Sequence, residues 1–137
     1  MSNKLFLFLA LLTFFLSSSA CSAANQQPKV SNLRMALDPE GRDVRSSFAP
    51  NDVFYVVADL ANAPRGTKFK AKWIALNTIG ADPNFEFQTQ TLDVTKETLT
   101  GKMYFQLSND NSWPAGQYRV DLYLNDTPAG SVEFSVQ

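Results

Sequence analysis

Histidine is absent from the 137 residues, and cysteine occurs only once, as Cys21. Without histidine the chain lacks the commonest general base, the commonest zinc ligand and the base of a Ser-His-Asp triad. One cysteine forms neither an internal disulfide nor a cysteine-rich metal site. No nucleophile elbow, phosphate-binding loop or dinucleotide fingerprint is present either. We therefore expect no enzyme activity, no cofactor and no bound metal.

An excess of charge of one sign is also missing. Without residues 1–20 the chain carries eleven Lys and Arg against thirteen Asp and Glu, which gives a net charge of −2. Nucleic-acid-binding domains have a basic surface, and attachment to anionic lipid surfaces by charge requires the same. We therefore expect no nucleic-acid partner, and no anionic membrane surface as the main partner.

The N-terminus has the organisation of a secretory signal peptide. Lys4 and the amino terminus give a weakly positive start, and residues 5–16 follow without a charge. Twelve residues are too few for a membrane-spanning helix, which needs about 20. A stretch of small residues, 17–20, comes next, as it does before a cleavage site.

The single cysteine follows these small residues directly. Ser18-Ser19-Ala20-Cys21 resembles the lipobox of bacterial lipoproteins, although Ser18 stands where that family prefers leucine. The resemblance implies that the signal peptide is cleaved before Cys21 and that the cysteine thiol is diacylated. It also implies anchoring to a bacterial membrane, facing the periplasm or the cell surface. The alternative is ordinary secretion, with cleavage after Ala23 or Ala24.

The remaining chain is long enough for one domain with a packed core. We expect a signal peptide over residues 1–20, a flexible tether over 21–28 and a β-domain over 29–137. Residues 22–28 are small and polar, and seven extended residues span at most about 25 Å. If Cys21 is acylated, the domain therefore stays close to its membrane.

Alternation of apolar and polar residues runs through the domain, and helical spacing is missing. The alternation and the turn signals between its segments predict strands near residues 30–37, 44–48, 53–60, 67–77, 85–91, 99–107, 118–124 and 132–136. Further turn signals lie at residues 62–66 and 126–130. Seven or eight short strands predict an all-β fold, an antiparallel β-sandwich.

Two features make this sandwich resemble an immunoglobulin-like or fibronectin-like domain. Gly116-Gln117-Tyr118-Arg119-Val120 is similar to the Gly-x-Tyr-x-Cys stretch of the tyrosine corner, with Val120 in place of the cysteine. Trp73 lies upstream on a predicted strand, as the core tryptophan of that fold does. The resemblance implies the fold and no activity.

Lys68, Lys70 and Lys72 form a basic row on one face of a predicted strand, with Arg65 nearby. One interpretation is a contact with an acidic partner or with lipid headgroups. The alternatives are an ordinary solvated face, or lysines that protect an edge strand from aggregation.

Three aromatic residues stand among polar residues. Alternation predicts that Tyr104 and Tyr123 point outward, and Trp113 lies in a long loop over residues 109–116. Exposed aromatic rings bind sugars and form hot spots of protein interfaces. The alternatives are ordinary strand tyrosines and a Trp113 that plugs one end of the sandwich.

Oxygen-rich loops at residues 38–43 and 109–112 do not match the spaced pattern of a calcium loop. A carboxylate pair of the glycosidase kind stays an alternative, since Asp and Glu suffice for it. Turn chemistry explains the Asp and Asn residues of both loops, since these residues bond to their own backbone. We therefore expect a membrane-anchored binding module with a protein partner in the cell envelope. The alternatives are a carbohydrate-binding domain that uses Tyr104, Trp113 and Tyr123, and a small carboxylate-dependent hydrolase.

The anchor can be tested by weighing the mature protein. Purified from its own membranes, it should have the mass of residues 21–137 plus acyl chains, because the lipobox cysteine becomes the acylated first residue. A lipid-free mass starting at Ala24 or Asn25 would contradict this. So would a Cys21→Ala protein that is processed and localised like the original.

Overall fold

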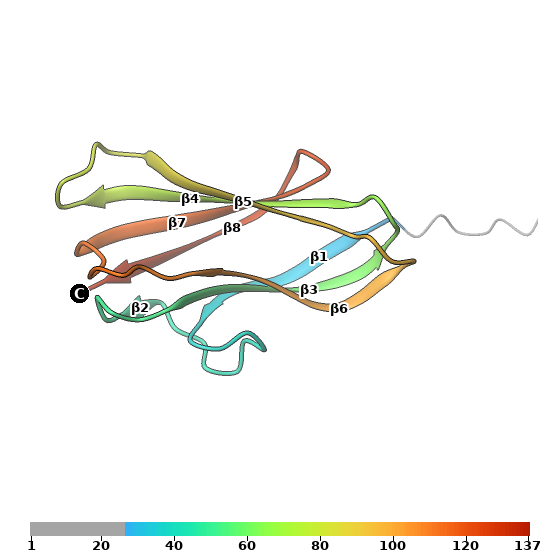
Figure 1. The fold of residues 1–137 in the computed structure, drawn as a ribbon, viewed down its shortest axis with the longest axis horizontal. Helices are drawn as coiled ribbons and strands as arrows, with labels where there is room; N and C mark the ends of the chain where they lie inside the picture. The colour runs from blue at the N-terminus through green and yellow to red at the C-terminus, as the bar shows by residue number, and fades with distance from the viewer. Residues whose placement is uncertain (1–26) are drawn as a thin grey trace, which may run out of the picture.

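The computed structural model describes residues 27–137 and shows a β-sandwich of eight strands (Figure 1). The predicted signal peptide, Cys21 and the tether up to residue 26 lie outside the described residues. The strands are β1 (Lys29–Ala36), β2 (Ser47–Phe48), β3 (Phe54–Ala63), β4 (Lys68–Thr78), β5 (Phe85–Asp93), β6 (Leu99–Leu107), β7 (Gly116–Leu124) and β8 (Thr127–Val136). Within this part of the chain, no helix is long and apolar enough to span a membrane.

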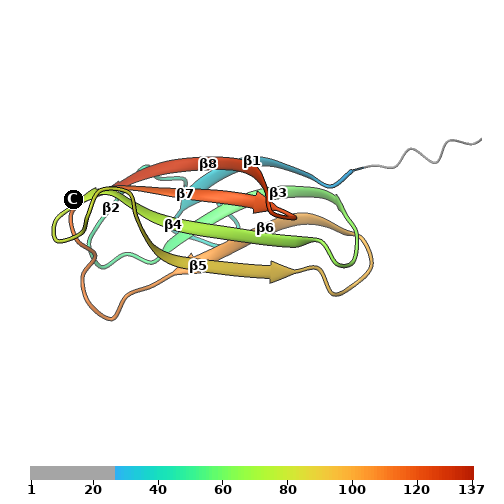
Figure 2. The same ribbon diagram turned by 90° about the horizontal axis from the view of Figure 1, so that it is seen from above.

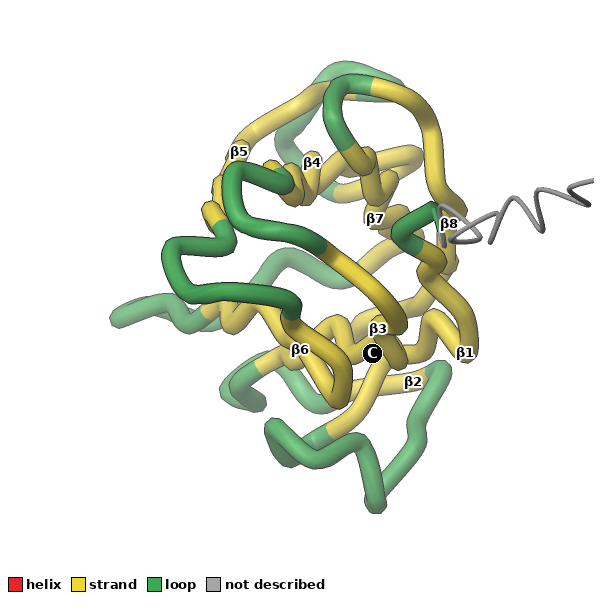
Figure 3. The backbone as a smooth tube through the Cα atoms, turned by 90° about the vertical axis from the view of Figure 1, so that its right-hand side faces the viewer, coloured by secondary structure: helices red, strands yellow, loops and turns green. Residues whose placement is uncertain are grey.

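The strands form two sheets that face each other, as the end view shows (Figure 3). One sheet has the order β1-β3-β6, and the other has the order β2-β8-β7-β4-β5. All pairings are antiparallel except the short pairing of β2 with β8. In Figure 2, β1 lies beside β8 along one side of the sandwich, and β5 lies near β6 along the other. The predicted fold class is confirmed.

Alternation places the core as predicted. Along β6, Met103, Phe105 and Leu107 are buried, while Tyr104 and Gln106 between them are exposed. The expected central strand β3 lies between β1 and β6 and buries residues on both of its faces. Such two-sided burial explains its nearly continuous apolar sequence.

Two predicted elements are wrong. Of the strand expected at residues 44–48, only Ser47 and Phe48 pair with β8, and Val44 forms an isolated bridge with Ala36. The segment between β1 and β2 crosses from one sheet to the other, so most of its residues pair with no strand. The turn expected at residues 126–130 is also too long, because β8 begins at Thr127.

The tight β7–β8 turn explains that second error. Asn125 and Asp126 both have positive φ, at 48° and 65°, and form a two-residue hairpin turn. Pro128 therefore lies inside β8, close to a register shift and outside the stretch that pairs with β2. A bulged or edge position tolerates proline, since no ladder donor is needed there.

Aromatic rings hold the two sheets together without a disulfide among residues 27–137. Phe134 of β8 lies at the centre, and its ring centroid is 5.0 to 6.3 Å from those of four others: Phe48, Phe54, Trp73 and Tyr118. Trp73 is fully buried, as predicted for the core tryptophan, and so is Val120 at the position of the missing cysteine.

The predicted tyrosine corner is present. The Tyr118 hydroxyl donates a hydrogen bond of 2.6 Å to the carbonyl oxygen of Pro114, four residues upstream. Burial raises the pKa of Tyr118, which keeps this donor protonated. The bond fixes the loop before β7 to the core of the sandwich.

A glutamine links the two sheets at the side where β5 and β6 form the edges. The buried indole nitrogen of Trp73 donates to Oε1 of Gln90, at 2.9 Å. Nε2 of Gln90 in turn donates to the backbone oxygen of Gln106 on β6, at 2.8 Å. One side chain thus satisfies the indole N–H and joins β5 to the opposite sheet.

Replacing this glutamine should destabilise the fold. Gln90→Leu keeps most of the side-chain volume but leaves the Trp73 N–H without its partner, which costs about 1–3 kcal/mol. Urea denaturation would measure the loss. Gln88→Leu is the control, because Gln88 is exposed on the same strand and has no side-chain hydrogen bond within residues 27–137; its effect should stay below about 0.5 kcal/mol. Equal effects of both variants would contradict the link.

Candidate binding site

Three loops meet at the end of the sandwich where β3 begins and β4 ends. These loops are residues 49–53, 79–84 and 108–115. The antiparallel registers bring them together, since Phe54 pairs with Leu107, Thr78 with Gly116 and Ala75 with Phe85. Lys29, the first residue of β1, lies at the opposite end of the long axis (Figure 1).

Hydrogen bonds join the three loops to one another. The backbone N–H of Trp113 donates to the carbonyl oxygen of Pro50 at 2.7 Å, and the Ser112 hydroxyl donates to Oδ1 of Asn51 at 2.8 Å. The Ile79 N–H donates to the carbonyl oxygen of Ala115 at 3.2 Å. The central loop, 108–115, is therefore fixed to both of the others.

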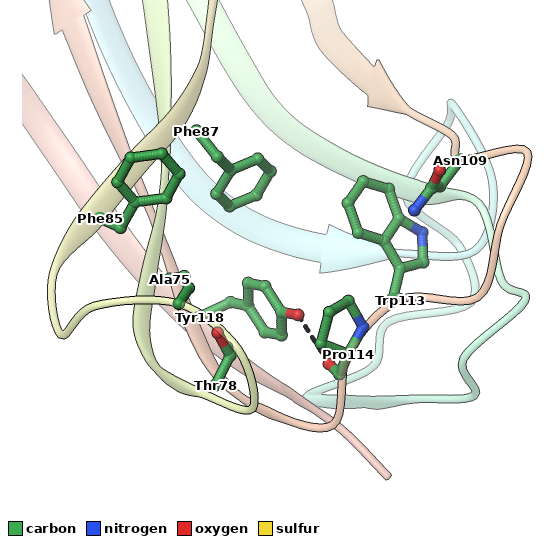
Figure 4. Close-up of a pocket in the computed structure, with 9 residues that line it drawn as sticks. Ala75, Thr78, Phe85, Phe87, Asn109, Trp113, Pro114 and Tyr118 are labelled. Carbon is green, nitrogen blue, oxygen red and sulfur yellow. Dashed lines mark hydrogen bonds between the residues drawn. The ribbon is translucent and has the colours of Figure 1, made fainter.

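An aromatic pocket with a volume of about 190 Å³ lies between β5 and the central loop (Figure 4). Four of its lining residues are aromatic: Phe85, Phe87, Trp113 and Tyr118. The others are smaller: Ala75, Thr78, Ala81, Asn109 and Pro114. Residues from β4, β5, β7 and two loops thus form one pocket.

The rings of this pocket continue into the core. Phe87 lies 6.0 Å from both Trp113 and Tyr118, measured between ring centroids. Trp113 also packs on Phe54 at 5.1 Å, and Tyr118 stacks on Phe134 at 5.2 Å. The floor of the pocket is therefore the end of the aromatic core, and core packing holds its shape.

The rim of the pocket is apolar and exposed. Phe85, a lining residue, is 52% exposed at the start of β5, and Ile79, which directly follows the lining residue Thr78, is 77% exposed at the start of the β4–β5 loop. Asn109 is the main polar group at the rim, and its Oδ1 accepts a hydrogen bond from the Asn111 N–H at 3.2 Å. The arrangement suits an apolar group that enters from solvent.

Of the predicted interaction residues, only Trp113 belongs to this pocket. It is partly buried against Phe54 and Phe87. It therefore closes one end of the sandwich, and its ring also lines the pocket.

The two tyrosines lie far from Trp113 and from each other. Tyr104 is 47% exposed on the outer face of the three-stranded sheet, where its ring contacts Tyr55 at 5.9 Å. Tyr123 lies on the outer face of the other sheet, with Lys70 and Lys72 each 5.8 Å from its ring centroid. Tyr104, Trp113 and Tyr123 thus occupy three different surfaces and do not converge on one site.

The predicted basic row is largely neutralised by neighbours. Lys70 forms an ion pair with Asp126, and Lys72 forms one with Glu86 at 3.0 Å. The hydrogen bond that Lys72 donates to Glu86 raises the pKa of Lys72, and the hydrogen bonds that Glu86 accepts from Thr89 and Lys72 lower the pKa of Glu86. The edge-protection interpretation is wrong, because β4 lies between β5 and β7.

Turn chemistry accounts for the two oxygen-rich loops. The Asp38 carboxylate accepts hydrogen bonds from the backbone N–H groups of Glu40, Arg42 and Asp43. The bond from Asp43 is the largest cause of the lowered pKa of Asp38. Among residues 27–137, no three His, Cys, Asp or Glu side chains cluster as metal ligands would.

No family model and no curated protein matches the chain, whereas solved structures do. An immunoglobulin-like protein from Pseudomonas aeruginosa is 8% identical and superimposes with a TM-score of 0.58, over 83% of this chain and 99% of its own. The Pseudomonas fluorescens alkylpurine DNA glycosylase AlkC, bound to DNA with an abasic site analogue, is 14% identical, with a TM-score of 0.50. A Bifidobacterium adolescentis GH3 β-glucosidase is 12% identical, with a TM-score of 0.52.

The two enzymes are much larger than this chain. The match covers 80% of the chain in each case, but 30% of the glycosylase and 17% of the glucosidase. At such low identity the likeness shows the fold alone, an immunoglobulin-like β-sandwich.

Sequence reasoning missed most of the pocket. Alternation places Phe85 and Phe87 on a strand and predicts no site there, and it gives Ile79 no role. One signal was available: Ile79 stands next to a turn of Gly, Asp, Pro and Asn, where an apolar side chain has little to pack against. The meeting of the loops depends on strand order, which local patterns do not reveal.

Gly116 fixes the position of the central loop and should not tolerate a side chain. Its φ is +149°, and an added Cβ would overlap the Asn77 carbonyl oxygen and lie 2.7 Å from Cα of Thr78. We expect Gly116→Ala to cost at least about 3 kcal/mol in unfolding free energy, because backbone strain and overlap add.

Gly66→Ala separates the cost of backbone strain from the cost of steric overlap. Gly66 has a φ of +86° with open space around it, so this control should cost only about 1 kcal/mol in the same denaturation experiment. Equal losses at both positions would mean that the close approach at Gly116 is unimportant.

Proposed function

We propose that the protein is a lipid-anchored extracytoplasmic binding module whose aromatic pocket receives one apolar side chain of a protein partner in the cell envelope. The observation that carries the proposal is the aromatic pocket at the end of the sandwich opposite Lys29. Its mechanism is recognition, and the anchor raises the local concentration of the domain near the membrane.

The size of the pocket favours a single side chain. Pockets for small-molecule ligands usually measure about 300–1,000 Å³, whereas an apolar cavity of roughly 150 Å³ holds a benzene-sized group. At about 190 Å³, this pocket falls in the second class. A buried apolar anchor in a pocket is the usual centre of a protein interface.

The rim supports the same conclusion. Ile79 and Phe85 expose large apolar surfaces next to the pocket, and such clusters mark interaction sites. A partner that inserts one side chain would also cover these two residues. The gain in buried apolar area would then extend beyond the pocket itself.

The proposed anchor gives the pocket a direction. The eleven residues of β4 span roughly 35 Å, at about 3.3 Å per residue. The domain is joined to Cys21 at its Lys29 end, through a tether of at most about 25 Å. The pocket therefore lies at the end of the domain farthest from the tether, where an envelope protein can reach it.

The two other functions have less support. A sugar site needs several hydrogen-bonding groups around its ring, and this pocket offers mainly Asn109 and Thr78. A carboxylate-dependent hydrolase needs an acid with a raised pKa. The five carboxyl groups with clearly shifted pKa values all have them lowered: Asp38, Asp43, Asp59, Glu86 and Asp126.

Site-specific photo-crosslinking tests the proposal in the native membrane. A benzophenone amino acid in place of Phe85 should give a discrete adduct with one envelope protein, since this position lies at the rim. The same probe in place of Leu99, an exposed apolar residue at the opposite end, is the matched control and should give none.

A second substitution makes the result specific to the rim. Ile79→Ser should reduce the Phe85 adduct at least about fivefold, because it removes an exposed apolar side chain without adding charge or disturbing the core. Equal adducts from both probe positions, or an adduct indifferent to Ile79→Ser, would overturn the proposal.

A further inference from the structure

We propose that the side chain that enters the pocket belongs to a cationic segment of the partner, an apolar residue flanked by lysine or arginine. This inference rests on the proposed function and adds the chemistry of the partner to it. The observation behind it is the distribution of charge around the pocket.

Two carboxylates flank the pocket. Asp82 follows the lining residue Ala81, and Asp110 follows the lining residue Asn109. Neither carboxylate takes part in an ion pair or a side-chain hydrogen bond within residues 27–137. The three loops that meet here, 49–53, 79–84 and 108–115, contain a third acid, Asp52, and no lysine or arginine.

Asp52 is different from the other two, because its carboxylate accepts a hydrogen bond of 2.7 Å from the Ala49 N–H and closes a turn. The nearby Arg45 pairs with Asp43 at 2.8 Å. The negative charge that is open to a partner at the pocket is thus that of Asp82 and Asp110.

The rest of the surface is different. Elsewhere in the described chain six acids are in ion pairs: Glu40, Asp43, Asp59, Glu86, Asp121 and Asp126. At the opposite end the loops mix both signs, with Arg65 and Lys96 beside Asp93 and Glu97. A pocket at that end is lined by Lys96 as well as Asp93, so among the residues described a pocket whose loops hold acids and no lysine or arginine occurs at one end only.

The two features have different effects on binding. Burial of an apolar side chain against Phe87, Trp113 and Tyr118 supplies affinity. Exposed carboxylates supply less affinity, but they favour basic flanks, oppose acidic flanks and attract a cationic partner at long range. Both carboxylates are exposed, so salt screens their attraction for a cationic partner. The Debye length, beyond which such an attraction is largely lost, is about 10 Å at 0.1 M salt.

The experiment uses three blocked peptides with one central phenylalanine: Lys-Gly-Phe-Gly-Lys, Ser-Gly-Phe-Gly-Ser and Glu-Gly-Phe-Gly-Glu. They are titrated into the full mature protein in detergent micelles, labelled with 5-fluorotryptophan and followed by fluorine NMR. The label gives one signal from Trp113 in the pocket and one from the fully buried Trp73, which serves as an internal control.

The lysine peptide should shift the Trp113 signal and leave the Trp73 signal in place. Its Kd at low salt should be about fivefold lower than that of the serine peptide and lower still than that of the glutamate peptide. At 0.5 M salt the difference should fall to within about twofold.

Two double variants isolate the charge effect. Asp82→Asn with Asp110→Asn should abolish the preference for the lysine peptide, whereas Asp93→Asn with Glu97→Gln makes the same charge change at the opposite end and should preserve it. Equal binding of the lysine and serine peptides to the original protein would overturn the cationic partner but leave the pocket standing. If no peptide shifts the Trp113 signal, the proposed function fails with it.

Discussion

Packing around one buried ring, Phe134, is central to this sandwich. The ring contacts Phe48, Trp73 and Tyr118 of its own sheet and Phe54 of the opposite sheet. Antibody domains connect their sheets with a disulfide beside the core tryptophan. Here no second cysteine exists, and edge-to-face contacts of Phe54 with Phe48 and Phe134 connect the two sheets instead. Packing must therefore be close throughout the end of the domain that carries these rings.

The close packing of these aromatic rings also forms the candidate binding site. A closed circuit of ring contacts runs from Phe134 through Tyr118, Phe87, Trp113 and Phe54 and back to Phe134. Three of these rings have one face in the core and another in the pocket. Their positions are fixed before any partner arrives, which lowers the entropy cost of binding. A rigid apolar pocket is thus a by-product of how the sandwich closes.

The sequence predicts those parts of the fold that depend on neighbours along the chain. Alternation locates most strands, and the stretch around Tyr118 predicts the corner that its hydrogen bond to Pro114 then forms. Prediction from the sequence fails where residues far apart in the chain determine the environment of a side chain. The sequence predicts that Lys70 and Lys72 form a basic row without ion pairs. Their partners Asp126 and Glu86 come close only when β4, β5 and the β7–β8 turn have formed. The sequence does not reveal the pocket for the same reason, since its rings, from Phe85 to Tyr118, come from segments up to 33 residues apart.

The fold itself leaves function open, because similar sandwiches form a whole protein in one case and a small part of two enzymes in others. What distinguishes this chain is the difference between its two ends. One end connects to the proposed anchor and carries charges of both signs, which a solvated surface near a membrane accepts at little cost. The other end exposes Ile79 and Phe85 beside an aromatic pocket, and its three loops hold acids but no lysine or arginine. Exposed apolar surface lowers solubility, and the proposed partner, by covering these two side chains, would remove that cost.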